Sequence, residues 1–541
     1  MGTVTNNPFS DAAAFLAARR TAGATDFPKR LLHGLTLKFL VIRTLSGAPR
    51  DAGSSEKKGL FVTVPFLTHN GVVKDMSDIS VQLRMPPVLD PGFLPASVYN
   101  RTFREMAARA GAVPLRLALE RADGSVSVFE TIVFAPGSPL FRLNLRYVER
   151  IVKFLLWQRG GWKVHVGGPK EIGEHIRTEY APGGAREFDA VFMGGVYEHP
   201  FTVVATEADN VPGAKETSVP LGRRLDGCRV GFDLGASDRK ASAVIGGEAI
   251  YSEEVAWDPR HASDPDYHYQ GILASIRSAA AHLPRLDAVG GSAAGIYINN
   301  RARVASLYRG VPKKDFDEKI AGMFLRIRDE LGVPLEVVND GEVTALAGSM
   351  SIGENPVLGV ALGSSQAAGY VDHAGNITGW LNELAFVPVD YRDGAPVDEW
   401  SGDGGCGVQY FSQVGANRVA IAAGMEFPSG LGLPERLVTL QEKMKAGDPL
   451  ARKVYETIGA YVGYGVAHYA DFYELKHILV LGRVTTGEGG EILVDVARNV
   501  LAAEFPDLAE RVNLALPDEK SRRVGQSIAA ASLPQIGKEK A

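Results

Sequence analysis

The sequence has few cysteines and no long hydrophobic run. Only Cys228 and Cys406 occur among its 541 residues, too few for a disulfide framework or for a zinc site built from cysteine. No stretch approaches the ~18 apolar residues of a membrane-spanning helix, and the first residues lack the basic and apolar segments of a secretory signal. We therefore expect a protein of the cytoplasm that has no membrane partner.

The sequence also lacks a strong net charge. Its formal net charge of -5 gives no general attraction to nucleic-acid phosphates or to anionic lipids, and no compact basic helix-turn-helix stands at its start. Hydrophobic residues make up 45% and charged residues 22% of the chain, as in ordinary folded proteins. This length predicts two or three domains, and a small molecule is a better candidate partner than nucleic acid.

A polar stretch rich in proline and glycine, residues 207–224, separates two regions of different pattern. Before it, residues 115–134 alternate apolar and polar side chains around a turn, which predicts a β-hairpin. Residues 141–158 have helical spacing, and residues 162–166 form a short apolar run followed by a turn and a second helix. We predict an α+β N-terminal domain, residues 1–222, whose pattern does not reveal its role.

After this stretch, strands alternate with long helices, which predicts α/β layering. Helical spacing is clear in residues 269–283 and 315–331. Two short apolar runs, residues 335–339 and 357–362, end in small or polar residues. An open α/β sheet presents its binding edge at such strand ends.

Phosphoryl transfer needs a backbone cradle for phosphates, a metal held by carboxylate or water, and a carboxylate that accepts the substrate proton. In FDLGASDRK, Asp233 ends an apolar strand and Gly235 permits a tight turn, so that backbone N–H groups and the Ser237 hydroxyl can face a phosphate. Read alone, this segment is better explained as an ordinary strand and turn. Asp340 follows a second strand at the start of a small-residue helix, either as a helix cap or as a buried base.

A third segment, VLGVALGSSQAAGYVDHAGNITGWLNELAFVPVD, supplies two strands separated by Gly363, Ser364 and Ser365. Small residues at this turn would let a second backbone loop approach the phosphates.

In this order, the three segments resemble the actin-like ATPase superfamily and, within it, the repressor, open-reading-frame and kinase (ROK) family of sugar kinases. The resemblance runs from about Val230 to the end of the chain. Residues 405–420 are similar to the helix after the family's zinc loop, residues 477–492 to its adenosine-binding strand and glycine-rich turn, and residues 524–532 to its closing helix. The resemblance implies a two-lobed, ribonuclease H-like α/β fold preceded by an additional α+β domain.

The resemblance also implies domain limits. The small lobe would span residues 223–345, the large lobe residues 346–515, and a C-terminal helix in residues 516–541 would return to the small lobe. Family members often dimerise, so a homodimer is compatible with the resemblance.

The implied activity is ATP-dependent phosphoryl transfer to a hydroxyl group of a sugar or related polyol, with ATP and Mg²⁺ as cofactors. Asp340 would be the general base, and Asp233 would position Mg²⁺ through water. On the substrate side the resemblance implies Asn339 and Glu383, with Glu342 beside them. The nucleotide would be bound by Gly235, Ser237, Gly363, Ser364, Ser365 and Gly482.

The sequence departs from the family on the substrate side. The family's zinc site uses one histidine and three cysteines, but the histidine position is Phe386 and the loop 398–406 keeps only Cys406, so no tetrahedral zinc site is expected. Glu342 stands where a small polar residue is usual, and Arg483 stands where glycine is common. These departures put the ordinary hexose specificity in doubt. The alternative hypothesis is a sugar-sensing or regulatory ROK-like protein without catalytic activity.

Overall fold

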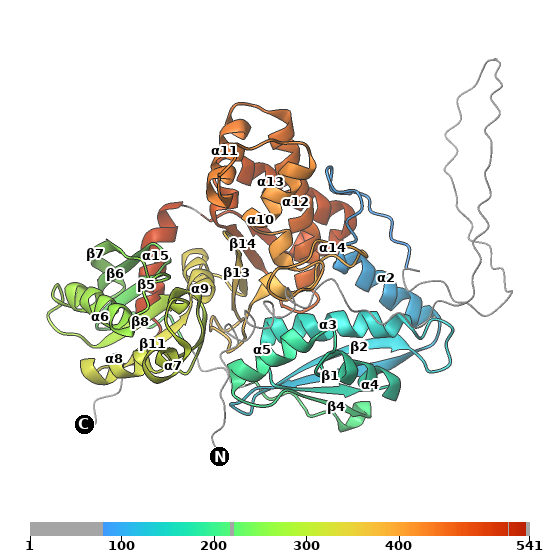
Figure 1. The fold of residues 1–541 in the computed structure, drawn as a ribbon, viewed down its shortest axis with the longest axis horizontal. Helices are drawn as coiled ribbons and strands as arrows, with labels where there is room; N and C mark the ends of the chain where they lie inside the picture. The colour runs from blue at the N-terminus through green and yellow to red at the C-terminus, as the bar shows by residue number, and fades with distance from the viewer. Residues whose placement is uncertain (1–78, 217–220, 518, 537–541) are drawn as a thin grey trace.

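The structure is a computed structural model that describes residues 79–216, 221–517 and 519–536. Three bodies are visible in Figure 1: an N-terminal region, a small lobe and a large lobe. In the described ranges, no helix combines the length and the apolar composition needed to cross a membrane.

The N-terminal region contains one mixed sheet with the strand order β2-β1-β3-β4. Its elements are α2 (Ala96–Arg109), β1 (Ala112–Glu120), β2 (Val126–Phe134), α3 (Leu143–Arg159), β3 (Lys163–Gly167), α4 (Lys170–Glu179), α5 (Glu187–Tyr197) and β4 (Thr202–Thr206). The predicted hairpin is β1 and β2, which pair antiparallel from Ala112 with Phe134 to Glu120 with Val126. The predicted helix at residues 141–158 is α3, so the pattern of this region is confirmed.

The small lobe is a five-stranded sheet with the order β11-β8-β5-β6-β7. Its elements are β5 (Cys228–Leu234), β6 (Asp238–Ile245), β7 (Glu248–Ala256), α6 (Pro265–Ala280), β8 (Ala288–Ala293), β9 (Ile296–Ile298), β10 (Arg301–Val304), α7 (Lys313–Asp315), α8 (Met323–Leu331) and β11 (Leu335–Asn339). Strands β5, β6 and β7 form an antiparallel meander, whereas β8 pairs parallel with β5 and β11 parallel with β8. The helical spacing of residues 315–331 does not give one helix, because the chain leaves the helical conformation at Gly322 before α8 begins.

The large lobe repeats this arrangement with the order β13-β12-β14-β15. Its elements are α9 (Asp340–Ile352), β12 (Val357–Leu362), β13 (Gln366–Val371), α10 (Gln413–Ala422), α11 (Leu433–Lys445), α12 (Pro449–Tyr469), β14 (His477–Leu481), α13 (Glu488–Glu504), α14 (Pro506–Arg511) and β15 (Asn513–Ala515). An antiparallel hairpin, β12 and β13, is again flanked by parallel strands, β14 beside β12 and β15 beside β14. Helix α9 connects the last strand of the small lobe to the first strand of the large lobe.

The last helix, α15 (Glu519–Ala531), packs against the small lobe beside α9 (Figure 1). Its backbone approaches β8 so closely that a Cβ atom at Gly290 would lie 1.7 Å from the carbonyl oxygen of Ala530. Glycine is therefore required at this strand position. Two sheets of matching strand order, joined by α9 and closed by α15, make the two-lobed, actin-like α/β fold, and the predicted fold class is confirmed.

The hydrophobic cores do not follow the division into three bodies. One core runs without a break from the N-terminal region into the large lobe and joins, for example, Trp157 of α3 to Tyr464 of α12. The small lobe has a separate core around Phe232 and Ile276. The N-terminal region therefore packs as part of the large lobe, although Glu198 after α5 also forms an ion pair with Arg303 in β10 of the small lobe.

Candidate active site

The first predicted phosphate loop is the turn between β5 and β6. The Gly235 N–H donates to the carbonyl oxygen of Asp238 (2.9 Å), and the indole N–H of Trp257 donates to the carbonyl oxygen of Gly235 (2.9 Å). Ser237 is exposed at the tip, and its hydroxyl donates to Asp238 Oδ2 (2.8 Å). The hairpin is therefore a closed turn that leaves the Ser237 side chain exposed.

The second predicted phosphate loop joins β12 to β13. The Gly363 N–H donates to the carbonyl oxygen of Ser365 (2.9 Å), and the Gln413 N–H at the start of α10 donates to the carbonyl oxygen of Gly363 (2.8 Å). The side chains of Ser364 and Ser365 are exposed. The loop is thus fixed at its base and open at its tip.

Gly482 brings the predicted adenosine turn against this second loop. Its φ is +100°, and a Cβ atom there would lie 2.5 Å from the carbonyl oxygen of Leu362. Only glycine tolerates both the dihedral angle and the approach. The turn after β14 and the loop after β12 therefore lie side by side, as the parallel pairing of the two strands requires.

The loops of the two lobes are within electrostatic reach of each other. Burial raises the pKa of Asp238, but hydrogen bonds from Ser237 and Lys240 and the positive charges of Lys240 and Arg483 outweigh burial and leave the pKa below its ordinary value. Asp238 belongs to the small lobe and Arg483 to the large lobe. The positive charge of Arg483 thus acts on the first phosphate loop from the other lobe.

Asn339, and not Asp340, is the N-cap of α9. The Asn339 Oδ1 accepts a hydrogen bond from the Gly341 N–H (2.8 Å), and its Nδ2 donates to the carbonyl oxygen of Gly295 (2.8 Å). Asp340 Oδ1 also accepts a hydrogen bond from the same Gly341 N–H (3.1 Å). Since Asn339 provides the cap that Asp340 was considered for, the start of α9 does not depend on the Asp340 carboxylate alone.

Asp233 lies at the end of β5, where its Oδ1 accepts a hydrogen bond from the Ser292 hydroxyl (2.7 Å). Burial raises the pKa of Asp340 to about 6, and the negative charge of Asp233 adds to this shift. Burial also raises the pKa of Asp233, although the hydrogen bond from Ser292 opposes it. The two carboxyl groups therefore lie within electrostatic reach of each other.

Two glutamates extend this group of carboxyls. Burial raises the pKa of Glu383 to about 7, with a contribution from the charge of Asp340. Burial raises the pKa of Glu342 to about 8, with a contribution from Glu383, while a hydrogen bond from Asn382 opposes the shift. The structure thus brings together the predicted base and two predicted substrate-side residues.

Sequence reasoning missed several neighbours of this group. Ser292 is the second-last residue of β8, a position near a strand end that the rule on strand ends could have supplied. The pKa of Tyr297 is raised by burial first, then by Tyr308 and by the charge of Asp340, which places its hydroxyl near the base. No local pattern around Tyr297 marks it. Asn382, beside Glu383, was missed for the same reason.

Asn382 and Glu383 are held by the N-terminal region. The Glu383 N–H donates to the carbonyl oxygen of Trp157 (2.9 Å), and the Asn382 N–H donates to the carbonyl oxygen of Gln158 (2.8 Å). Asn382 has a φ of +51°, a left-handed conformation that is uncommon for residues other than glycine. Its side chain is fixed by Tyr473, whose hydroxyl donates to Asn382 Oδ1 (2.8 Å).

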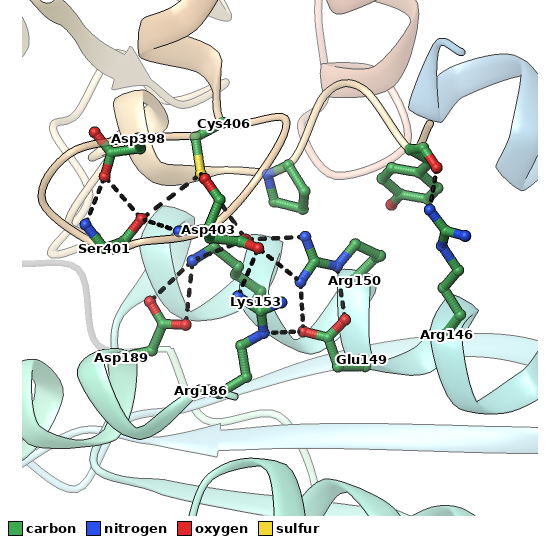
Figure 2. A network of polar contacts seen from close by, with 12 residues as sticks. Arg146, Glu149, Arg150, Lys153, Arg186, Asp189, Asp398, Ser401, Asp403 and Cys406 are labelled. Carbon is green, nitrogen blue, oxygen red and sulfur yellow. Dashed lines mark hydrogen bonds and ion pairs between the residues drawn. The ribbon is translucent and has the colours of Figure 1, made fainter. Parts of the chain in front are cut away.

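The positions that correspond to the family's zinc ligands have other neighbours here. The ring of Phe386 stacks on Trp157 with 4.2 Å between the ring centroids. Cys406 lies close to Asp403 and Lys153 in a buried ionic cluster (Figure 2). Within the described ranges, no group of three or more His, Cys, Asp or Glu side chains could hold a metal ion.

The ionic cluster joins α3 and α5 to the loop 398–406 of the large lobe. Its three cations and three anions are Arg150, Lys153, Arg186, Glu149, Asp189 and Asp403. The Lys153 ammonium lies 3.1 Å from Asp189 and 3.3 Å from Asp403, and it is completely buried. Burial lowers the pKa of Lys153, but the two carboxylates outweigh burial and raise it above its ordinary value. The group is therefore charged.

Comparison with solved structures finds chains of the family that the sequence motifs resemble. A ROK hexokinase from Thermus thermophilus is 19% identical, with 56% of this chain and 98% of that chain covered and a TM-score of 0.44. A ROK family glucokinase from Streptomyces griseus, solved with glucose and AMPPNP, is 21% identical, with 56% and 99% covered and a TM-score of 0.42. A ROK family transcriptional regulator, a homologue of the E. coli MLC protein, is 18% identical, with 56% and 78% covered and a TM-score of 0.46.

No family model and no curated protein matches the sequence. The likeness to the solved chains concerns the fold. It is the strand order of the two sheets, together with α9 and α15, that identifies the region from β5 to α15 as a two-lobed, actin-like α/β fold.

Proposed function

We propose that this protein transfers a phosphoryl group from ATP to a hydroxyl group of a sugar or related polyol. The observation that carries the proposal is the position of Asp340. It is a half-buried carboxylate at the start of α9, the helix that connects the lobes, and it lies within electrostatic reach of Asp233 and Glu383. The two turns proposed for the phosphates follow β5 and β12, one in each lobe.

Asp340 is suited to accept a proton. A pKa of about 6 leaves the carboxylate ionised at neutral pH yet more basic than an exposed aspartate. Such a base takes the proton of the attacking hydroxyl as the oxygen bonds to phosphorus. Because Asn339 caps α9, the proton-accepting oxygens of Asp340 are not needed to complete the helix.

The two loops and the turn after β14 fit a nucleotide. Gly235, Ser237, Gly363, Ser364 and Ser365 would surround the phosphates, and Gly482 would lie near the adenosine. Asp233 alone suits Mg²⁺, which usually keeps several waters and needs few protein carboxylates. When bound, Mg-ATP supplies the phosphoryl group and the metal neutralises its charge.

The proposed substrate side contains both hydrogen-bond donors and hydrogen-bond acceptors. With a pKa of about 8, Glu342 carries a proton at neutral pH and can donate a hydrogen bond, whereas Asp340 can only accept. Glu383, with a pKa of about 7, can do either. Such a mixed set suits a polyhydroxylated acceptor, whose hydroxyls donate and accept.

A thermal-shift screen of Mg-ATP with sugars, polyols and amino sugars, followed by an ADP-release assay, tests the proposal. We expect stabilisation by Mg-ATP and ADP release with at least one acceptor. Replacing Asp340 with Asn should abolish ADP release while the shift with Mg-ATP persists. An Asp340→Asn variant with unchanged turnover would refute the assignment of the base.

The second candidate is a sugar-sensing protein without catalysis. Glu342 favours this candidate. It replaces a small polar residue of the family, so the substrate side differs from the family pattern while the phosphate loops resemble it. In this case a sugar would raise the melting temperature, but no ADP would form with any acceptor.

A further inference from the structure

The C-terminal end of helix α3 contacts the segment that carries Asn382 and Glu383. The last four carbonyl groups of any α-helix have no partner within the helix. In α3, the N–H groups of Glu383 and Asn382 satisfy two of them, those of Trp157 and Gln158. The large lobe therefore caps a helix of the N-terminal region with the segment that carries Glu383.

The same two hydrogen bonds hold a strained residue. Asn382 adopts a left-handed conformation, which persists only when its surroundings fix it. Its N–H is bound by α3, its Oδ1 accepts from Tyr473, and its Nδ2 lies 3.4 Å from Glu342 Oε1. Asn382 thus links the end of α3 to both glutamates of the substrate side.

Trp157 is itself held in place from two directions. Its ring is fully buried and stacks on Phe386, and its indole N–H donates to Asp189 Oδ1 (2.7 Å). Asp189 belongs to the ionic cluster and pairs with Lys153. The last turn of α3 is therefore anchored by a charged network on one side and by the ring of Phe386 on the other.

We propose that the N-terminal region forms part of the acceptor-binding site, because the C-terminal turn of α3 holds Asn382 and Glu383 in the conformation that presents Glu383 to the substrate. Trp157 is the positioning residue. The proposal rests on the proposed phosphoryl transfer, in which Glu383 binds the acceptor. It gives residues 79–216 a role in acceptor binding.

The variant Trp157→Phe removes the hydrogen bond to Asp189 and leaves an aromatic ring against Phe386. Trp162→Phe is the matched control, since the Trp162 ring stacks on His199 in the same region and its indole N–H has no hydrogen-bond partner among the residues that the structure describes. We expect Trp157→Phe to raise KM for the acceptor by about tenfold, as small displacements of binding groups do. KM for ATP should change less than about twofold by the same reasoning, and Trp162→Phe should change neither.

Amide hydrogen exchange measures, without any substrate, how stably the Asn382 and Glu383 N–H groups are hydrogen-bonded to α3. In Trp157→Phe, the amides of Asn382 and Glu383 should exchange faster, whereas Trp162→Phe should leave them as in the unmodified protein. Phe386→Leu, which removes the stacking partner from the large lobe, should have the same local effect and covers the case in which Trp157→Phe does not fold. Unchanged exchange at both amides in Trp157→Phe and Phe386→Leu would overturn the proposal.

The two readouts separate this proposal from the proposed function. If no acceptor is phosphorylated by the unmodified protein, the proposed function fails. Faster exchange of the Asn382 and Glu383 amides in Trp157→Phe would still show that α3 fixes these two residues. If acceptor turnover is found but Trp157→Phe raises KM for ATP and for the acceptor equally, the specific role of Trp157 is refuted.

Discussion

The carboxylate of Asp233 lies close enough to Asp340 for its negative charge to raise the pKa of Asp340. Asp233 ends the first strand of the small lobe, and Asp340 begins the helix that leaves this lobe. The proposed metal-positioning group and the proposed base therefore influence each other electrostatically, and a change at one should be measurable at the other.

The proposed base predicts the acid limb of the pH profile. Since the pKa of Asp340 is about 6, kcat/KM for the acceptor should fall tenfold per pH unit below this value, as the carboxylate takes up its proton. Asp233→Asn removes the charge that contributes to the shift and should lower the pKa of Asp340. Carbon NMR titration of the Asp340 carboxyl measures this without turnover, and an unchanged titration would contradict the coupling.

Replacing Glu342 with Gln should stabilise the protein at alkaline pH. Burial raises the pKa of Glu342 from 4.5 to about 8, so the folded state keeps a proton that the unfolded chain loses. The contribution of this group to stability therefore decreases as pH rises from about 4.5 to about 8. Glutamine keeps the shape and has no proton to lose.

Thermal or urea denaturation of both proteins across this range checks the prediction. The variant should be more stable than the unmodified protein by on the order of 3 kcal/mol near the upper limit. The difference should vanish at the lower limit. A difference that does not depend on pH would show that Glu342 does not titrate as described.

Lys153→Met should destabilise the protein by about 3–5 kcal/mol, because it removes the ion-pair partner of the buried Asp189 and one of the three cations that pair with Asp403. Lys476→Met is the matched control. Lys476 pairs with Glu354 at 3.0 Å, but both side chains are half exposed, and such a pair contributes at most ~1 kcal/mol. Urea denaturation compares the two variants, and equal effects would refute the importance of the buried cluster.

Arg483→Gln should weaken nucleotide binding. Arg483 is exposed on the large lobe, and its charge acts on the first phosphate loop of the small lobe. There it would attract the phosphates, and an exposed charge of this kind is screened by salt. We expect KM for ATP to rise severalfold at low salt and by less at high salt, with KM for the acceptor unchanged. A rise in KM for the acceptor alone would contradict the assignment of Arg483 to nucleotide binding.

The parts of the fold that follow from local pattern were predictable from the sequence. The hairpin of β1 and β2, helix α3 and the strand ends at Asp233 and Gly363 all rest on periodicity and turn residues, which are short-range signals. The residue that caps α9 was not predicted: Asp340 was considered as a cap or a base and Asn339 as a substrate-side residue, although either residue type can cap a helix.

The environment of α3 could not be predicted in this way. Glu149, Arg150 and Lys153 look like the charged side of a surface helix, yet all three are buried. Their burial depends on Asp403, about 250 residues further along the chain, and no local pattern reports such a partner. For the same reason, the contact between α3 and Glu383 became visible only in the structure.

The core that surrounds α3 is completed by residues far along the chain, and this affects how the chain folds during its synthesis. Helix α3 ends at Arg159, whereas α12, which shares its core, ends at Tyr469. At ~5–20 residues per second, the intervening ~310 residues take roughly 15–60 s to be made. During that time the apolar and charged side chains of α3 lack their core and ion-pair partners from the large lobe, because these have not yet been synthesised. We therefore expect nascent chains to bind a chaperone at this stage and to dissociate from it once α12 has been made.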